Sequence, residues 1–211
     1  MPRTSSDSTK PDFSTTRLAI FASGSGSNAE SILRHFSDHP TIEVALIVYN
    51  RREAGVRARA ERFDVPAEYI PREKWQDSGY ILKKMNVCGI DFIALAGFLL
   101  LIPKYLVRAF PQRILNIHPA LLPKFGGKGM YGSHVHRAVH AAGATESGMT
   151  VHIVDEHYDE GDIVFQVKTL LEKSDTPEDI AARVLKLEHL YYPSVIERYI
   201  KQVLNDEPEK K

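Results

Sequence analysis

The sequence predicts an α/β fold: a single domain with a mostly parallel, twisted sheet and helices on both faces. The first observation is a length of 211 residues with 43% hydrophobic and 26% charged side chains, which suits one globular domain with a packed core. The second is the alternation of short apolar runs with helical segments, which is typical of parallel strands joined by right-handed crossovers. We expect this domain at residues 17–204, between a disordered N-terminal tail (1–16) and a charged C-terminal tail (205–211).

The strands of the first half are predicted from runs of consecutive apolar side chains. Such runs are typical of strands that are buried on both faces, as in a parallel sheet. The segments between them carry apolar side chains at helical spacing, as Ile32, Leu33 and Phe36 do in the first helix. We predict strands at 18–22, 44–48, 67–70, 92–96 and 114–117, and helices at 28–36, 54–63, 73–85 and 105–110.

After Pro119 the pattern changes. A glycine-rich loop (126–132) precedes a short helix (135–142). Two strand-like runs follow, 148–154 and 163–171, and an acidic turn joins them. These runs extend the predicted sheet.

The last segment reads as a long helix with clear start signals. Thr176 is suited to the N-cap and Pro177 to the first helical position. Apolar side chains then recur on one face. Pro193 is expected to break or kink this helix, because it lacks the backbone N–H that a helix interior needs.

Charge and composition exclude several classes of partner. The chain has 27 Lys and Arg against 27 Asp and Glu, so no global field attracts nucleic acid or an anionic membrane. Cys88 is the single cysteine and cannot form an internal disulfide. No apolar stretch approaches a membrane span, and the start lacks the apolar core of a secretory signal. We therefore expect a cytoplasmic protein without nucleic-acid or membrane partners.

A glycine loop follows the first predicted strand and opens the first helix. Gly24, Gly26 and Ala29 fit the G-x-G-x-x-A pattern, whose glycines and free helix N–H groups cradle a phosphate. The dinucleotide fingerprint also expects an acid at the end of the second strand, and this sequence has Arg51 and Arg52 there. NAD is therefore disfavoured, whereas an NADP-dependent reductase stays open, as does a simple tight turn capped by residue 27 or 28.

Asn116 and His118 are the first candidates for catalysis. They lie two residues apart at the end of a strand, so both side chains point to the same face. Pro119 favours an extended backbone, which projects both groups at the carboxyl edge, where open α/β sheets bind ligands. An amide donor beside an imidazole suits addition at a carbonyl, because the amide stabilises the oxyanion and the imidazole transfers protons.

Such a site still needs a carboxylate, and the acidic turn can supply one. Pattern alone equally describes a solvated turn, since Asp is common there. The turn offers five acids, namely Asp155, Glu156, Asp159, Glu160 and Asp162.

Five motifs together resemble the family of folate-dependent formyltransferases, in the order in which that family has them. They are Ser-Gly-Ser-Gly-Ser-Asn (23–28), Leu-Ala-Gly-Phe (95–98), Asn-Ile-His-Pro-Ala-Leu-Leu-Pro (116–123), Gly-Met-Thr-Val-His (148–152) and Asp-Glu-Gly (159–161). The resemblance covers residues 17–202. It implies a Rossmann-like formyltransferase fold and transfer of a formyl group from 10-formyltetrahydrofolate to the amine of glycinamide ribonucleotide, in purine biosynthesis.

The resemblance also implies the site residues. Asn116, His118 and Asp159 would be the catalytic trio, and Asp159 would raise the pKa of His118. Leu100 stands where a relative has a basic residue. The residues implied to bind the ribonucleotide are Gly26, Ser27 and Asn28, at its phosphate, and Glu188. The residues implied to bind the folate are Arg72, Phe98, Leu99, Leu100, Leu101 and Ile102.

Other histidines suggest less chemistry. His134, His136 and His140 resemble a metal cluster, but no carboxylate or cysteine with ligand spacing accompanies them, so we expect no metal. His152, in a predicted strand, is interpreted as a hydrogen-bonded structural residue that the resemblance places near the wall of the site.

Three further functions remain as alternatives. One is the NADP-dependent reductase. Another is a different folate enzyme of the family that formylates methionyl-tRNA or deformylates the folate, although both normally carry an additional domain for which we see no candidate segment. The third is a module that only binds folate or nucleotide. The expected partners are two small-molecule substrates, and the chain is expected to be a monomer or a homodimer.

Overall fold

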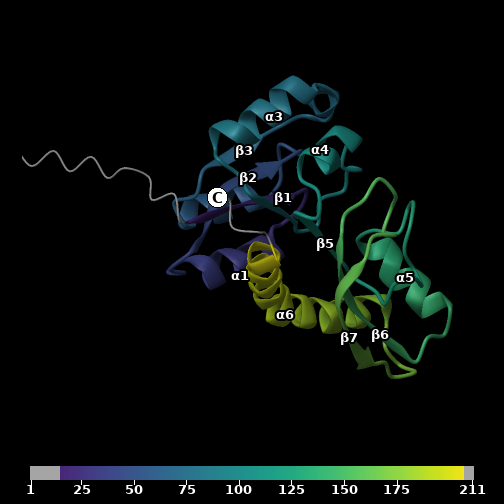
Figure 1. The fold of residues 1–211 in the computed structure, drawn as a ribbon. Coiled ribbons are helices and arrows are strands. Elements are labelled where there is room, and N and C mark those ends of the chain that lie inside the picture. Colours follow the sequence, from purple (N-terminus) through teal and green to yellow (C-terminus); the bar gives the residue numbers. More distant parts are fainter. Residues whose placement is uncertain (1–14, 207–211) are drawn as a thin grey trace, which may run out of the picture.

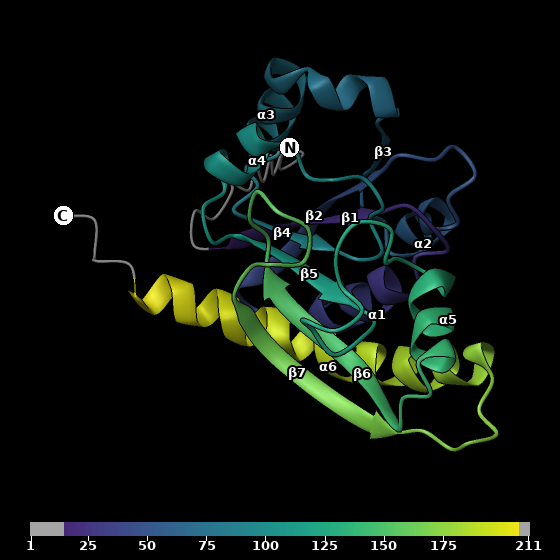
Figure 2. The same cartoon turned by 90° about the vertical axis from the view of Figure 1, so that its right-hand side faces the viewer.

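The apolar runs form one seven-stranded sheet in the computed structural model, which describes residues 15–206. Its order is β3-β2-β1-β4-β5-β6-β7 (Figure 1 and Figure 2). The first five strands in this order are parallel to one another, β6 is antiparallel to β5, and β7 is antiparallel to β6. The predicted mostly parallel α/β fold is thereby confirmed. The strands are β1 (Thr16–Ala22), β2 (Ile42–Tyr49), β3 (Ala67–Tyr69), β4 (Phe92–Leu95), β5 (Ile114–His118), β6 (Glu146–Ile153) and β7 (Ile163–Leu170).

Helices cover both faces of this sheet, as Figure 2 shows with α3 and α4 on one side and α1 and α6 on the other. Side chains alternate along β1, so Leu18 and Ile20 join one buried cluster while Ala19 and Phe21 join a second. Each face therefore has its own core. The helices are α1 (Ser27–Phe36), α2 (Val56–Arg62), the 3₁₀ helix η1 (Arg72–Gln76), α3 (Ser78–Val87), α4 (Lys104–Ala109), α5 (Ser133–Ala141) and α6 (Pro177–Asp206).

The helix predicted at 73–85 is in fact two helices, η1 and α3. Asp77 separates them, because its backbone is non-helical and its side chain accepts a hydrogen bond from the Tyr80 N–H at 3.0 Å. This is an N-cap, which starts a new helix rather than continuing the old one. The prediction missed it because apolar spacing alone does not register an internal cap.

The N-terminus of α6 has the predicted cap. The Thr176 hydroxyl accepts a bond from the Asp179 N–H at 3.2 Å, and the Asp179 carboxylate accepts one from the Thr176 N–H at 2.9 Å. Of the break or kink expected at Pro193, the break is wrong, since α6 runs through this residue to Asp206. Tyr192, Pro193 and Val195 are all buried, and this tertiary packing offsets the hydrogen bond that proline removes.

Ordered elements extend slightly past the predicted domain limits. Thr16 is the first residue of β1 and is buried, and Asn205 and Asp206 belong to α6, so none of the three lies in a tail. Residues 1–14 and 207–211, which hold most of both predicted tails, lie outside the described residues. Within 15–206, no helix is long and apolar enough to cross a membrane.

Tyr192 ties α6 to the centre of the sheet. Its hydroxyl is fully buried and donates to the carbonyl oxygens of Leu95 at 3.0 Å and Leu115 at 3.3 Å. These two carbonyls belong to β4 and β5. These two hydrogen bonds therefore fix α6 against β4 and β5, whose carboxyl ends lead into the cavity described below.

We predict that Tyr192→Phe lowers the free energy of unfolding by about 1 kcal/mol, because it deletes a buried hydroxyl donor without changing the ring. Urea unfolding measures this change. Tyr191→Phe is the matched control, since the half-buried Tyr191 ring packs against Phe165 at 5.4 Å and keeps that contact without its hydroxyl. Equal unfolding midpoints for Tyr192→Phe and the wild type would contradict the role assigned to this hydroxyl.

Candidate active site

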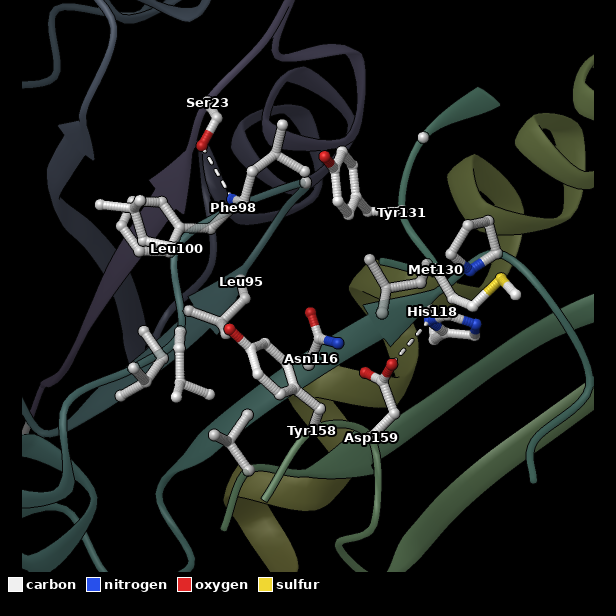
Figure 3. Close-up of a pocket in the computed structure, with 18 of the residues that line it drawn as sticks. Ser23, Leu95, Phe98, Leu100, Asn116, His118, Met130, Tyr131, Tyr158 and Asp159 are labelled. Atoms are coloured by element: carbon white, nitrogen blue, oxygen red, sulfur yellow. Dashed lines mark hydrogen bonds and ion pairs between the residues drawn. The ribbon is translucent and has the colours of Figure 1, made fainter. Parts of the chain in front are cut away.

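A cavity of about 390 Å³ opens at the carboxyl ends of the parallel strands (Figure 3). This is the edge at which open α/β sheets bind ligands, because the loops after successive strands meet there. The structure brings most of the predicted site residues to this cavity: Asn28, Phe98, Leu99, Leu100, Leu101, Ile102, Asn116, His118, Asp159 and Glu188. Three predicted residues do not line it: Gly26, Ser27 and Arg72.

Asp159 lies between two histidines at one end of the cavity. Its carboxylate approaches His118 Nδ1 and His152 Nε2, each at 3.5 Å, and accepts a hydrogen bond from the Gly127 N–H at 2.9 Å. Its backbone has a φ of 56°, which Asp tolerates better than most residues. Such local strain is typical of functional positions. Of the five acids in the turn, Asp159 is the one that lines the cavity.

The Asp159 carboxyl is held in its ionised form. Burial raises its pKa, but the adjacent His152 and His118 rings and the hydrogen bond from the Gly127 N–H outweigh burial and bring the pKa below its ordinary value. The site thus contains a partly buried carboxylate that stays charged at neutral pH.

His118 is almost fully buried, and its ring is fixed from both sides. Nε2 lies 2.8 Å from the carbonyl oxygen of Phe125, which can only accept, so Nε2 carries a hydrogen and Nδ1 faces Asp159. Burial lowers the pKa of His118 and outweighs the opposite effects of Asp159 and Phe125. The expectation that the pKa is raised is therefore wrong in net direction, although the contribution of Asp159 has the predicted sign.

Asn116 and His152 face each other across the β5–β6 pair. The Asn116 amide donates to His152 Nε2 at 3.0 Å, and His152 Nδ1 donates to its neighbour's carbonyl, that of Ile153, at 2.9 Å. His152 is thus the hydrogen-bonded structural residue that we predicted, and it also contacts two of the three proposed catalytic residues. The second amide hydrogen of Asn116 remains available to a ligand.

At the other end of the cavity, the partly buried Asn28 is hydrogen-bonded to the buried Glu188. Asn28 Nδ2 donates to Glu188 Oε2 at 2.6 Å, and Glu188 is only 7% exposed. Burial raises the pKa of Glu188 to about 7, against the opposing effect of the Asn28 bond. Glu188 is therefore a carboxyl that changes charge near neutral pH.

The glycine loop is built differently from the capped turn that we kept as an alternative. Neither Ser27 nor Asn28 caps α1, because Gly26 occupies the N-cap with a φ of 78° and no side chain bonds there. A Cβ at Gly26 would also approach Val56 to 2.7 Å. Gly26 is thus required by the packing of α1 on α2, whereas Gly24 faces the cavity with no atom near its Cβ position.

The segment 98–102 is fixed by the glycine loop. The Ser23 hydroxyl accepts a bond from the Leu99 N–H at 2.9 Å (Figure 3). The Ser23 N–H donates to the Gly97 carbonyl at 3.0 Å. Leu100 and Leu101 give this wall an apolar surface. Arg72 begins η1 as an exposed residue away from the cavity lining.

Sequence reasoning missed several lining residues. Met130 and Tyr131 come from the glycine-rich loop and Tyr158 from the acidic turn, and both tyrosines are partly exposed beside the cavity (Figure 3). The signal was a large side chain, Met or Tyr, within a loop that otherwise consists mostly of small or charged residues. His136, which we weighed only as a metal ligand, is buried in the cavity wall, and burial lowers its pKa.

No metal site accompanies these residues in the described part of the chain. Within 15–206, no group of three or more His, Cys, Asp or Glu side chains is arranged to hold a metal ion.

Comparison with known proteins identifies close similarity to one family. A model described as "Formyl transferase" matches residues 16–196. Phosphoribosylglycinamide formyltransferase of Bacillus subtilis is 36% identical over 199 residues, which cover 92% of this chain and 98% of the relative. The chloroplastic phosphoribosylglycinamide formyltransferase of Arabidopsis thaliana is 45% identical over 186 residues and 85% of this chain. The matched part spans only 64% of the length of the Arabidopsis protein and 60% of that of the Vigna unguiculata one.

Solved structures agree with the sequence relatives. Glycinamide ribonucleotide transformylase 1 from Symbiobacterium toebii superposes with a TM-score of 0.83 at 31% identity, over 90% of each chain. Phosphoribosylglycinamide formyltransferase from Brucella melitensis superposes with a TM-score of 0.79 at 36% identity, over 88% of this chain and 95% of the other. The similarity therefore includes the whole sheet.

The buried Glu188 predicts a pH-dependent stability. The pKa of Glu188 is about 7 in the fold, against an ordinary value of 4.5. The protonated carboxyl therefore contributes fully to the free energy of unfolding below pH 4.5, and this contribution is lost as the pH rises through 7. Glu188→Gln removes this loss while keeping an acceptor for Asn28. We predict that the variant gains up to about 3 kcal/mol over the wild type between pH 5 and pH 8.

Urea unfolding of both proteins at the two pH values measures that gain. Glu178→Gln, at an exposed position of the same helix, is the control and should show little pH-dependent difference. A difference between Glu188→Gln and the wild type that does not change with pH would show that the carboxyl is already ionised at pH 5.

Proposed function

The chain belongs to the formyltransferase family, and we propose that it transfers the formyl group of 10-formyltetrahydrofolate to the amine of glycinamide ribonucleotide in purine biosynthesis. The observation that carries this proposal is the grouping of Asn116, His118 and Asp159 at one end of a single cavity (Figure 3). An amide donor, an imidazole and an ionised carboxylate suit an acyl transfer between two nitrogens. The substrates named for the relatives support the same reaction.

Asn116 serves the first step of this mechanism. The neutral amine attacks the formyl carbon, a new C–N bond forms, and negative charge develops on the formyl oxygen. The free amide hydrogen of Asn116 donates to that oxyanion, while His152 holds the amide in place through its other hydrogen. The preorganised donor stabilises the tetrahedral intermediate more than the ground state.

His118 and Asp159 move the proton that the attacking nitrogen must lose. Because burial keeps the resting imidazole neutral, Nδ1 can accept that proton when the attacking nitrogen becomes positive. Asp159 then faces an imidazolium and stabilises its charge. The same proton passes, directly or through water, to the folate nitrogen as its bond to the formyl carbon breaks, which leaves the catalytic groups unchanged.

Each substrate has a matching part of the cavity. The apolar segment 98–102 suits the flat ring system of the folate, and Leu100 can contribute only apolar contact there. Asn28, Glu188 and the open backbone at Gly24 suit the ribonucleotide, with polar groups for its ribose and phosphate. We assign no contact to Arg72 or to the Ser27 side chain, and Gly26, which has no side chain, also lies outside the cavity lining.

The alternative functions have weaker support. An NADP-dependent reductase shares only the glycine loop and the arginines after β2 with this chain, whereas the transferase accounts for the catalytic trio as well. The named relatives also favour transfer to glycinamide ribonucleotide over action on methionyl-tRNA or simple deformylation. A cytoplasmic location and a monomeric or homodimeric state remain parts of the proposal, as does a single formyltransferase domain.

An absorbance assay of folate release tests the proposed function. The protein is supplied with 10-formyltetrahydrofolate together with glycinamide ribonucleotide, methionyl-tRNA or water alone, and NADPH binding is followed separately by fluorescence. We expect rapid release with the ribonucleotide only. Equal rates with water would indicate a deformylase, and faster release with the tRNA would indicate the other transferase.

We predict that His118→Ala lowers turnover by about 10²–10⁴-fold with little change in the KM of either substrate, which is the usual effect of losing a positioned proton-transfer group. Steady-state kinetics measure the two parameters separately. Normal turnover with an increased KM would instead make His118 a binding residue.

We predict that Asp159→Asn lowers turnover by orders of magnitude while the fold is kept, because the amide has the same shape but no charge to stabilise the imidazolium. The pKa of His118 should fall further in this variant, since Asp159 is one of the groups that raise it. Proton NMR follows the titration. Glu160→Gln, at an exposed position of the same turn, should leave both unchanged, and an identical result for the two variants would make Asp159 part of a solvated surface.

A further inference from the structure

We propose that Arg51 is a phosphate-binding residue, whose guanidinium holds the phosphate of the ribonucleotide at the end of the cavity away from His118 and Asp159. The inference rests on the proposed function and extends it. Arg51 lies in the turn after β2 and lines the cavity together with Gly24 and Asn28.

The Arg51 side chain is an exposed cation that has no partner among residues 15–206. Among the arginines of residues 15–206, only Arg51 and Arg72 have side chains that make no ion pair, hydrogen bond or ring contact, and Arg72 does not line the cavity. Arg52, its neighbour, stacks on Tyr69 instead. An arginine that faces the cavity and makes no ion pair of its own is available to an anionic ligand.

The register of the sheet places Arg51 beside the glycine loop. Ala22 of β1 pairs with Tyr49 of β2, and Gly24 and Arg51 each follow two residues later. The Ala54 N–H donates to the Arg51 carbonyl at 3.0 Å, which closes the turn, and the Val56 N–H donates to the Gly24 carbonyl at 3.3 Å, which joins the two loops. These backbone contacts therefore hold the Arg51 main chain next to the glycine loop.

The loop supplies the other half of a phosphate site. Gly24 has open space at its Cβ position, so a ligand can approach its backbone closely. The N-terminus of α1 follows, and free helix N–H groups favour an anion there. The planar guanidinium of an arginine binds phosphate oxygens in a bidentate manner, which gives the pair both strength and orientation.

The distance along the sheet fits the proposed substrate. From β5, which carries Asn116 and His118, the order continues through β4 and β1 to β2. The gap between β5 and the β1–β2 pair is two to three strand spacings, about 10–15 Å. The ribose and glycinamide groups between the phosphate and the amine can bridge this gap, so Arg51 and the catalytic trio can hold opposite ends of one molecule.

Steady-state kinetics of Arg51→Gln test the proposal. We expect the KM for glycinamide ribonucleotide to rise roughly 10- to 100-fold, the usual effect of losing a charge-assisted hydrogen bond. The KM for 10-formyltetrahydrofolate should not change. With the dephosphorylated glycinamide riboside, the variant and the wild type should be equally poor. Arg52→Gln is the matched control and should behave as the wild type does.

Three outcomes would overturn the proposal: an unchanged KM for the ribonucleotide, an equal loss with the riboside, or a rise confined to the folate KM, which would place Arg51 at the folate carboxylates. Calorimetry with ribose 5-phosphate separates this test from the proposed function. If the wild type fails to formylate the ribonucleotide but binds ribose 5-phosphate in an Arg51-dependent manner, the proposed function fails and the phosphate site stands. If ribose 5-phosphate binds both proteins equally, the phosphate site fails whatever the activity.

Discussion

The contact between the His118 ring and the Asp159 carboxylate constrains the whole carboxyl edge of this protein. Burying an imidazole and a charged carboxylate together is costly unless each is held by further partners. Here the Gly127 N–H and His152 hold Asp159, and the Phe125 carbonyl holds His118. These partners come from separate loops and from β6, so the pair exists only when the sheet and its loops are complete.

The need to hold His118 and Asp159 together explains two local features of the fold, the backbone conformation of Asp159 and the position of the glycine-rich loop. The chain accepts a positive φ at Asp159 because that conformation directs the carboxylate to the two histidines. The glycine-rich loop comes close enough for the Gly127 N–H to donate. Asn28 and Glu188 form a second, partly buried polar pair in the cavity lining, and the segment 98–102 adds an apolar wall. The cavity lining thus combines polar pairs with an apolar wall.

Most of the sheet could be predicted from the sequence, because apolar runs and helical spacing report burial directly. Asn116 and His118 could be placed as well, since a period of two and a following proline fix their direction. The contacts of Asp159 needed a fold or a resemblance, because five acids lie in its turn and pattern does not separate them. The net pKa of His118 could not be predicted, since it depends on how deeply the ring is buried and not only on its neighbours. Likewise, the cap at Asp77 and the packing that carries α6 through Pro193 depend on tertiary contacts.

The central claim is that burial keeps the resting His118 neutral, with its hydrogen on Nε2, so that Nδ1 can accept the proton released by the attacking amine. Nitrogen-15 NMR of the imidazole rings of the wild-type protein tests this directly, because the two ring nitrogens have different shifts when one carries the hydrogen. The account predicts a neutral His118 ring at pH 7, protonated on Nε2, with a pKa below the ordinary value of 6.5. A His118 ring that is already an imidazolium at pH 7 would contradict it.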